Sequence, residues 1–246
     1  MISEKGRSAP AETLFATEDG TIAAWSPTVD KHHALIEVDN SATGAVYKAL
    51  TLGSNDQGNF IYATNFHDGT VDVFDSQFHQ VQLAGSFTDP AVPAGFAPFG
   101  IKDVNGTIFV TYAQQNDSKH DDVAGAGNGF IDEFDTNGNL IQRFASEGTL
   151  NSPHGLAVAP ADFGAFSNAL LVGNFGDGRI NAFDLKTGRF LGQLADASGH
   201  PITNVGIWGM TFGNGAGGTR TNTLYFVAGI NGEQDGLFAS LSLANP

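Results

Sequence analysis

Apolar and polar residues alternate in short runs along this chain, and the runs recur at regular intervals. A continuous apolar run such as 59–64 (NFIYAT) ends before a glycine, and an alternating run such as 70–74 (TVDVF) follows it. A polar turn such as 135–139 (DTNGN) then leads to another run, 140–144 (LIQRF). Alternation with a period of two, bounded by Gly, Asn and Asp, is typical of β-strands joined by tight turns. The pattern therefore predicts three strands in each repeat.

A shared glycine aligns five copies of this unit. The aligned glycines are Gly20, Gly69, Gly129, Gly178 and Gly236. Two residues after each glycine lies an apolar residue: Ile22, Val71, Ile131, Ile180 and Phe238. A further large apolar residue follows at the fifth position: Trp25, Phe74, Phe134, Phe183 and Leu241. The glycines are 49 to 60 residues apart, which is close to the length of a four-stranded propeller blade.

A fourth strand opens the next unit, as in 98–104 (PFGIKDV), 153–159 (PHGLAVA) and 207–213 (IWGMTFG). We therefore predict an all-β fold, a β-propeller of the NHL type with about five blade-like repeats of four antiparallel strands. One domain is expected over residues 1–246. Its repeats fall approximately at 13–39, 45–87, 98–145, 153–195 and 205–242.

The two ends of the repeat array are incomplete. No innermost strand is recognisable before the first repeat, and no outer strand follows the last one. The array either closes as five uneven blades or stays open and exposes sheet edges. Because exposed edges pair readily with another chain, a homodimer through these edges is expected.

Long contiguous stretches resemble one family of proteins. They are 15–25 (FATEDGTIAAW), 119–144 (KHDDVAGAGNGFIDEFDTNGNLIQRF) and 152–184 (SPHGLAVAPADFGAFSNALLVGNFGDGRINAFD). They resemble a largely uncharacterised family of bacterial NHL-like propellers, some of which are exported and carry a PEP-CTERM sorting tail. The resemblance implies a six-bladed fold with an additional N-terminal portion, which this chain lacks, and an exported or extracellular location. Its residue at the position of His154 is Trp.

Composition narrows the range of partners. The chain has 26 acidic and 11 basic residues and a formal net charge of −15, which disfavours nucleic acid as a partner because polyanions are repelled. It has no cysteine, so disulfides, thiol catalysis and thiolate metal sites are excluded. No apolar run approaches the length of about 18 residues that a membrane span needs, and residues 1–20 do not read as a signal peptide. The sequence thus predicts a soluble chain with no membrane span.

Candidate site residues gather on one expected face of the propeller. There, the starts of the innermost strands and the loops between second and third strands surround the channel mouth. Phe99, His154 and Trp208 lie at strand starts. The loops carry Glu18, Asp19, Asn65, His67, Asp68, Asn174, Asp177, Asn231, Glu233 and Asp235. Asn and Asp beside Gly are also ordinary turn formers, so these side chains have a purely structural interpretation as well.

His154 and His67 are the candidate catalytic residues, because an imidazole at the mouth is suited to general-base chemistry. His67 stands where the otherwise similar stretch 174–184 has Gly176. The alternative for His154 is that it packs where Trp is otherwise found. His120 and Asp121, in the longest inserted loop (115–129), are candidate ligand-binding residues, and Asp121 with Asp122 is a candidate calcium site. A polar surface loop also needs such residues for solvation.

Two functions fit these features. The first is a scaffold that binds a small molecule, glycan or protein at the mouth through Phe99, Trp208, Asn65, Asn174, His120 and Asp121. The alternative is a Ca²⁺-dependent propeller hydrolase or lactonase acting on lactones or esters, with His154 or His67 moving a proton. Six-bladed calcium-dependent lactonases of the gluconolactonase type commonly have Asn or Asp at the positions where this chain has Phe99, His154 and Trp208. This difference counts against the second function.

Overall fold

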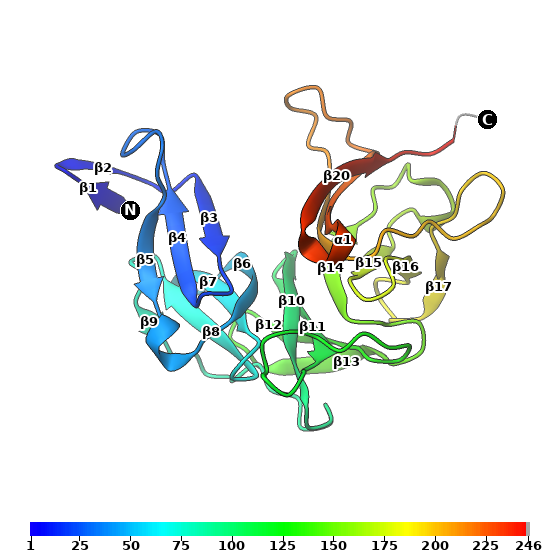
Figure 1. The fold of residues 1–246 in the computed structure, drawn as a ribbon, viewed down its shortest axis with the longest axis horizontal. Helices are drawn as coiled ribbons and strands as arrows, with labels where there is room; N and C mark the ends of the chain where they lie inside the picture. The colour runs from blue at the N-terminus through cyan, green and yellow to red at the C-terminus, as the bar shows by residue number, and fades with distance from the viewer. Residues whose placement is uncertain (245–246) are drawn as a thin grey trace. The chain divides into compact units, whose positions relative to one another are not determined.

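The computed structural model describes residues 1–244, which form antiparallel sheets connected in chain order (Figure 1). We number the sheets that follow the N-terminal hairpin as blades 1 to 5. Blades 2, 3 and 4 have four strands each: β6 (Tyr47–Asn55), β7 (Gly58–Asn65), β8 (Thr70–Asp75) and β9 (Gln80–Val81); β10 (Phe96–Val104), β11 (Thr107–Gln114), β12 (Phe130–Asp135) and β13 (Leu140–Ser146); β14 (Pro153–Val158), β15 (Leu170–Asn174), β16 (Ile180–Phe183) and β17 (Phe190–Gln193).

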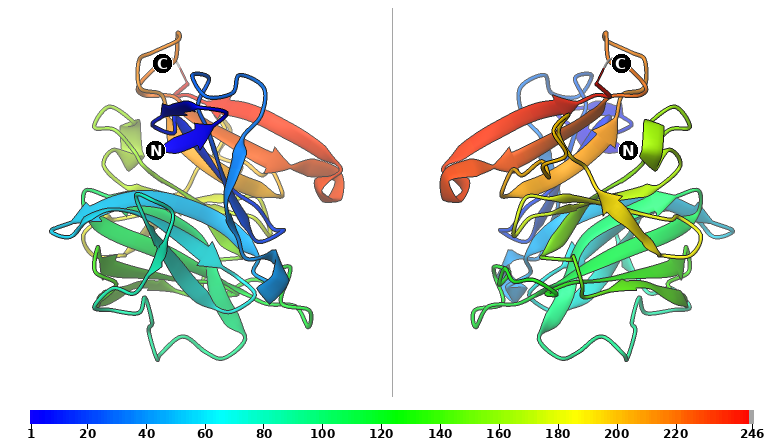
Figure 2. Two further views of the ribbon diagram at one scale, coloured as in Figure 1. Left: turned by 90° about the vertical axis from the view of Figure 1, so that its left-hand side faces the viewer. Right: turned by 90° about the vertical axis from the view of Figure 1, so that its right-hand side faces the viewer.

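Blades 1 and 5 have three strands each: β3 (Thr13–Ala16), β4 (Thr21–Trp25) and β5 (Leu35–Asp39); β18 (Ile207–Phe212), β19 (Leu224–Gly229) and β20 (Asp235–Leu241). Figure 2 shows the strands of blade 5, coloured orange to red, side by side as one sheet. These are the two repeats whose sequences lack an innermost or an outer strand. The predicted all-β class and propeller-type blades are confirmed.

Helical structure within residues 1–244 is limited to three short segments: η1 (Ser41–Thr43), η2 (Gly164–Phe166) and α1 (Ile230–Glu233). A hairpin of β1 (Ile2–Glu4) and β2 (Arg7–Ala9) precedes blade 1. The sequence pattern does not predict this hairpin, because strands of three residues are too short to show alternation. None of the helices in residues 1–244 is long and apolar enough to span a bilayer.

The chain forms two compact units. The first comprises residues 1–110, 115–121 and 133–142, and the second comprises the described residues 111–114, 122–132 and 143–244. In the first unit, Ile61 and Phe74 of blade 2 pack against Ile22 of blade 1. In the second, Leu171 of blade 4 packs against Phe226 of blade 5. Each unit therefore has a core formed between neighbouring sheets, where a fully buried large apolar side chain contributes about 1.5–3 kcal/mol.

Candidate functional site

The innermost strands of blades 2, 4 and 5 break register at the same place. The shift falls at residue 48 in β6, at 154 in β14 and at 208–209 in β18, so Lys48, His154 and Trp208 occupy equivalent positions. Phe99 follows Pro98 in β10 as His154 follows Pro153 in β14. An irregularity of this kind re-aims a side chain away from the ladder. Lys48 is therefore the blade 2 residue equivalent to the predicted strand-start residues His154 and Trp208.

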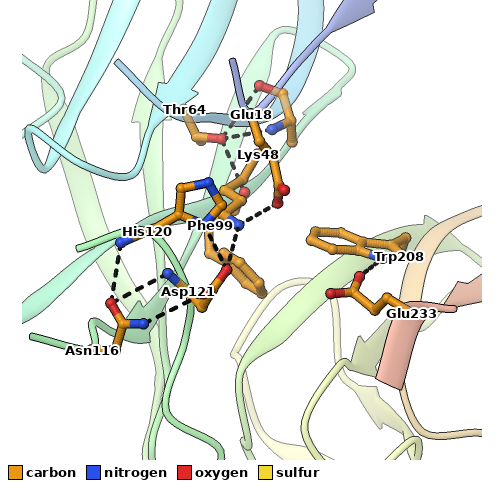
Figure 3. Close-up of polar contacts among 10 residues, drawn as sticks. Glu18, Lys48, Thr64, Phe99, Asn116, His120, Asp121, Trp208 and Glu233 are labelled. Atoms are coloured by element: carbon orange, nitrogen blue, oxygen red, sulfur yellow. Dashed lines mark hydrogen bonds and ion pairs between the residues drawn. The ribbon is translucent and has the colours of Figure 1, made fainter. Parts of the chain in front are cut away.

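Lys48 connects three loops of the first compact unit (Figure 3). Its side chain is only 3% exposed and forms an ion pair with Glu18, from the loop between β3 and β4. A second ion pair, 3.7 Å long, joins its Nζ to Asp121 in the loop between β11 and β12. Nζ also lies 5.8 Å from the ring centroid of Phe66, within range of a cation–π interaction. Two carboxylates thus compensate a buried ammonium that would otherwise be costly.

The loop that carries the predicted residues His120 and Asp121 is organised by Asn116. Asn116 Oδ1 accepts the backbone N–H of His120 at 3.1 Å, and its backbone N–H donates to the Asp121 carbonyl at 2.8 Å. His120 Nδ1 lies 2.7 Å from Asp121 Oδ1. Partial burial acts to raise the pKa of Asp121, but the hydrogen bond from His120 and the charges of His120 and Lys48 outweigh it and hold the pKa below its usual range. Asp121 is therefore an ionised carboxylate engaged by its neighbours.

The predicted calcium ligands Asp121 and Asp122 do not belong to a cluster of suitable donors. Across residues 1–244, no group of three or more His, Asp or Glu side chains is arranged to hold a metal ion. Calcium takes about 6–8 oxygen ligands, whereas one Asp121 oxygen already contacts both Lys48 and His120. This donor set does not fit a resident calcium ion.

Asn65 and His67 lie side by side but have different surroundings. Asn65 is 2% exposed; its Nδ2 donates to Asp68 at 2.9 Å and to Asp72 at 3.1 Å. The half-buried His67 lies beside the backbone of Gly44, where a Cβ on Gly44 would be 3.7 Å from Nε2. Asn65 thus stabilises the turn through its hydrogen bonds. The His67 side chain is not required for the turn, because the matching turn of blade 4 has Gly176 at this position.

Phe99 differs from the exposed aromatic surface expected at the mouth. It is fully buried, and its ring centroid lies 5.3 Å from that of Phe66. Its carbonyl accepts a hydrogen bond from the Thr64 hydroxyl at 2.9 Å (Figure 3). Phe99 therefore contributes its ring to the core of the first unit.

Trp208 and His154 come together in the second compact unit. Their ring centroids are 4.7 Å apart in an edge-on arrangement, and His154 Nδ1 lies 3.1 Å from the Trp208 carbonyl. Because a carbonyl only accepts, this hydrogen bond requires a proton on Nδ1. Trp208 also contacts Phe175, with the two ring centroids 4.7 Å apart and the rings tilted by 57°. His154 is thus largely buried, and its ring packs against the indole.

Glu233 fixes the other edge of Trp208. The indole N–H donates to Glu233 Oε1 at 2.8 Å (Figure 3). Glu233 belongs to a turn of three consecutive residues with left-handed backbone, Asn231, Gly232 and Glu233, at φ 55°, 63° and 65°. Non-glycine residues in this region cost about 1–3 kcal/mol each, and such strain clusters at functional sites. Sequence reasoning placed Glu233 in this loop but had no signal for its contact with Trp208.

A groove runs along blade 5 beside Trp208. It has a volume of about 510 Å³, and its lining includes Trp208, Val227, Glu233, Asp235 and Phe238. Val227 and Phe238 are cross-strand partners and are 42% and 71% exposed. The site therefore combines an exposed aromatic and aliphatic surface with two carboxylates at one end.

Asn174, another predicted site residue, lies in blade 4 and is fully buried. Its Nδ2 donates to the Thr149 carbonyl at 2.8 Å and to Asp177 at 3.0 Å. Within residues 1–244 its Oδ1 accepts no hydrogen bond. Burial without a partner is costly for a polar atom, so this side chain is less well satisfied than Asn65.

Lys48 is the residue that sequence reasoning missed. The three predicted strand-start residues are each followed by Gly, but Lys48 is followed by Ala49. An alignment anchored on that glycine therefore passes over blade 2. Sequence spacing identifies Lys48 instead: it precedes Gly69 by 21 residues, and His154 precedes Gly178 by 24 residues.

The fold and these sites define a β-propeller-type protein, and comparisons with known proteins agree on the fold. No protein-family model matches the chain. Three uncharacterized proteins of Acanthamoeba polyphaga mimivirus are 30%, 31% and 32% identical over 234, 235 and 235 residues. The alignments cover 94%, 93% and 93% of this chain and 42%, 56% and 60% of those proteins. The chain thus spans about half the length of the curated relatives it matches.

Solved structures give the same picture at lower identity. A gluconolactonase from Xanthomonas campestris superposes with a TM-score of 0.57 at 16% identity, covering 88% of this chain and 65% of that protein. Regucalcin, a calcium-binding protein from Agrobacterium tumefaciens, gives 0.53 at 12% identity, covering 85% and 60%. A luciferin-regenerating enzyme gives 0.53 at 10% identity, covering 91% and 70%. Similarity at these identities establishes the fold alone.

Proposed function

We propose that the chain is a ligand-binding scaffold and that the groove of blade 5 binds a glycan. The observation that supports this most directly is the indole of Trp208, held by Glu233 beside the exposed Phe238 in one groove. Aromatic rings offer an apolar face to the C–H side of a sugar ring, with a polar edge for orientation. Carboxylates at the end of the groove accept strong hydrogen bonds from hydroxyl groups. An apolar floor with few convergent polar groups is the usual composition of a ligand site.

The test measures tryptophan fluorescence in a variant that keeps Trp208 as its single tryptophan. The protein has two Trp residues, so a Trp25→Phe variant reports on Trp208 alone. We expect a saturable change in emission with at least one of a panel of neutral hexasaccharides of glucose, N-acetylglucosamine, mannose and xylose. Phe238→Ser should weaken that binding at least tenfold, because it removes half of the aromatic floor.

A matched control is Phe190→Ser, which changes an exposed Phe of blade 4 outside the groove lining. It should leave the affinity within a factor of two. If no sugar of the panel gives a saturable change, or if both serine variants weaken binding equally, the glycan proposal is wrong.

The second candidate function is a hydrolase or lactonase. The observation that favours it is the contact between His120 Nδ1 and Asp121 Oδ1 at 2.7 Å, because an imidazole oriented by a carboxylate is suited to activating water as a general base. His154 and His67 belong to the same candidate as proton carriers. The Asp121 and Asp122 carboxylates do not fit a calcium site, so this function is proposed without a metal-assisted step.

A panel of γ- and δ-lactones and p-nitrophenyl esters, with and without chelator, tests this candidate. Turnover that falls at least a hundredfold in His120→Gln and is unaffected by chelator supports it. Turnover lost on chelation restores the metal-dependent form, and no turnover with any substrate removes the candidate.

Three further predictions from the sequence belong to this proposal. We infer membership of the bacterial NHL-like family with an exported location, a single domain, and a homodimer through exposed sheet edges. Sedimentation velocity at several concentrations tests the homodimer. A monomer at all concentrations up to about 100 μM removes that prediction.

A further inference from the structure

A second groove lies at the N-terminal hairpin, on a part of the molecule that the proposed function does not use. It has a volume of about 380 Å³ and is formed by the hairpin β1–β2 and the loop of residues 29–32. Its charged lining residues are Glu4, Lys5, Arg7, Asp30, Lys31 and His32. Three of the 11 basic residues of a strongly acidic chain thus meet at one groove.

The hairpin side of the groove is anchored in the core. Ile2 and Ala9 are cross-strand partners, are 1% and 7% exposed, and pack in a cluster with Val29. Side chains two residues apart in a strand point to the same face. The neighbouring pair Glu4 and Arg7 therefore continues the anchored face over the groove, so Arg7 is presented from a fixed backbone.

The loop side is organised by Asp30. Its Oδ1 accepts the backbone N–H groups of His32 at 2.7 Å and His33 at 3.2 Å, and its Oδ2 lies 3.1 Å from His33 Nδ1. The backbone hydrogen bond from His32, followed by the side-chain hydrogen bond from His33, lowers the pKa of Asp30 to about 2. The carboxylate is engaged within its own loop and holds the backbone that carries Lys31 and His32.

The charge balance of the groove is positive at neutral pH. Three cations, Lys5, Arg7 and Lys31, face two carboxylates. Glu4 is paired with Lys5 at 3.1 Å, and Asp30 is engaged by its own loop. Among residues 1–244, neither Arg7 nor Lys31 forms a salt bridge. Because charges beyond about 10 Å are largely screened at 0.1 M salt, the net charge of −15 repels a long polyanion more than a small anion in this groove.

We propose that this groove binds a small tetrahedral oxyanion ester, a phosphate or sulfate monoester. The guanidinium of Arg7 supplies a planar pair of donors that matches two oxygens of such a group. Lys31 approaches as a point charge from the opposite loop. The position of the two cations on separate, internally braced segments is what distinguishes the groove from a set of scattered surface lysines.

The experiment is an amide NMR titration of the full chain with methyl sulfate and, separately, methyl phosphate, at constant ionic strength. We expect saturable shifts confined to residues 4–7 and 29–32. Arg7→Gln and Lys31→Gln should each weaken binding at least fivefold. Lys186→Gln removes the same charge from an exposed site outside the groove and should leave the affinity within a factor of two.

Each outcome decides the proposal. Saturable binding of one ester identifies it as the ligand class, and binding of both assigns a general oxyanion site. Shifts that stay linear in concentration, or that weaken equally in Lys186→Gln, show charge screening and overturn the proposal. Arg7 and Lys31 are exposed and lie on different segments, so an altered hairpin in one variant leaves the other as an independent test.

Discussion

Residues 65–75 of blade 2 and 174–184 of blade 4 have the same backbone hydrogen bonds at their turns but different side-chain hydrogen bonds. Phe66 N–H donates to the Val46 carbonyl and Phe175 N–H to the Ser152 carbonyl, both at 2.8 Å. The turn is closed in the same way in both copies: Gly69 N–H donates to the Asn65 carbonyl at 3.0 Å, and Gly178 N–H donates to the Asn174 carbonyl at 3.1 Å. The repeated sequence Asn-Phe-x-Asp-Gly therefore encodes a turn.

The side chains of the two copies are satisfied differently. In blade 2, Asn65 Oδ1 accepts the N–H of Val46 at 3.3 Å. In blade 4, Ser152 has a left-handed backbone with φ 47°, and its N–H donates instead to the Asn128 carbonyl at 2.9 Å. Among residues 1–244, no donor reaches Asn174 Oδ1. The repeated turn is thus the same in both blades, whereas the side-chain hydrogen bonds around it differ between them.

The largest expected effect is at the position where the copies differ most, His67 and Gly176. A Cβ on Gly176 would lie 2.1 Å from Asn151 Oδ1, which already accepts the Gly125 N–H at 2.7 Å. Gly176→His should therefore destabilise the protein by about 3 kcal/mol, at the upper end for overpacking. His67→Gly, its reciprocal, should cost less than about 1 kcal/mol, since His67 is only half-buried. Urea denaturation measures both.

The double variant Asn151→Gly with Gly176→His is the control, because it removes the obstructing amide. It should be less destabilised than the sum of its single variants. Equal costs for His67→Gly and Gly176→His would show that the contact with Asn151 does not distinguish the copies.

The next effect separates the two asparagines. Asn65→Ala removes donors to Asp68 and Asp72 and the acceptor for Val46, so it should cost about 2 kcal/mol. Asn174→Ala removes two donated hydrogen bonds but also an unpartnered buried oxygen, and should cost about 1 kcal/mol. Thermal and urea unfolding of the two variants give the comparison. A larger loss for Asn174→Ala contradicts it.

The sequence predicts the blades well because their determinants are local. A glycine turn and alternating residues specify strands such as β7 and β8 without reference to distant residues. The burial of Phe99 is not predictable in this way, since it depends on Phe66, which is 33 positions away.

The candidate site is less predictable for the same reason. Trp208 and His154 follow from the strand-start pattern, but the hydrogen bond from Trp208 to Glu233 depends on an unusual left-handed turn. Lys48 is identified by pairing register, and its partners Glu18 and Asp121 come from two other repeats. Side-chain networks assembled from several loops have no local sequence signal.

A smaller effect of opposite sign is expected at Ser152. Its left-handed backbone suits glycine, and its buried hydroxyl has no hydrogen-bond partner within residues 1–244. Ser152→Gly should therefore stabilise the protein by about 0.5–1 kcal/mol. Val46→Gly, at the equivalent position of blade 2, should destabilise it because it removes a buried side chain. A loss of stability in Ser152→Gly, measured by urea denaturation, goes against the strain assigned to blade 4.

The smallest effect concerns charge, which distinguishes Lys48 of blade 2 from its blade 4 counterpart His154. The pKa of Asp121 is lowered in the folded protein, so its contribution is present above the ordinary Asp pKa of about 3.9 and is lost as pH falls through the lowered value. Because Asp121 is 60% exposed, Asp121→Asn should cost only a few tenths of a kcal/mol at pH 7. Urea denaturation from pH 7 to about pH 2 should show this difference constant above about pH 4 and shrinking as pH falls below it, because the contribution vanishes only below both the unfolded and the folded pKa. Asp117→Asn, in the same loop, is the matched control. A deficit of Asp121→Asn that stays undiminished down to about pH 2 assigns the loss to packing rather than to the ion pair with Lys48.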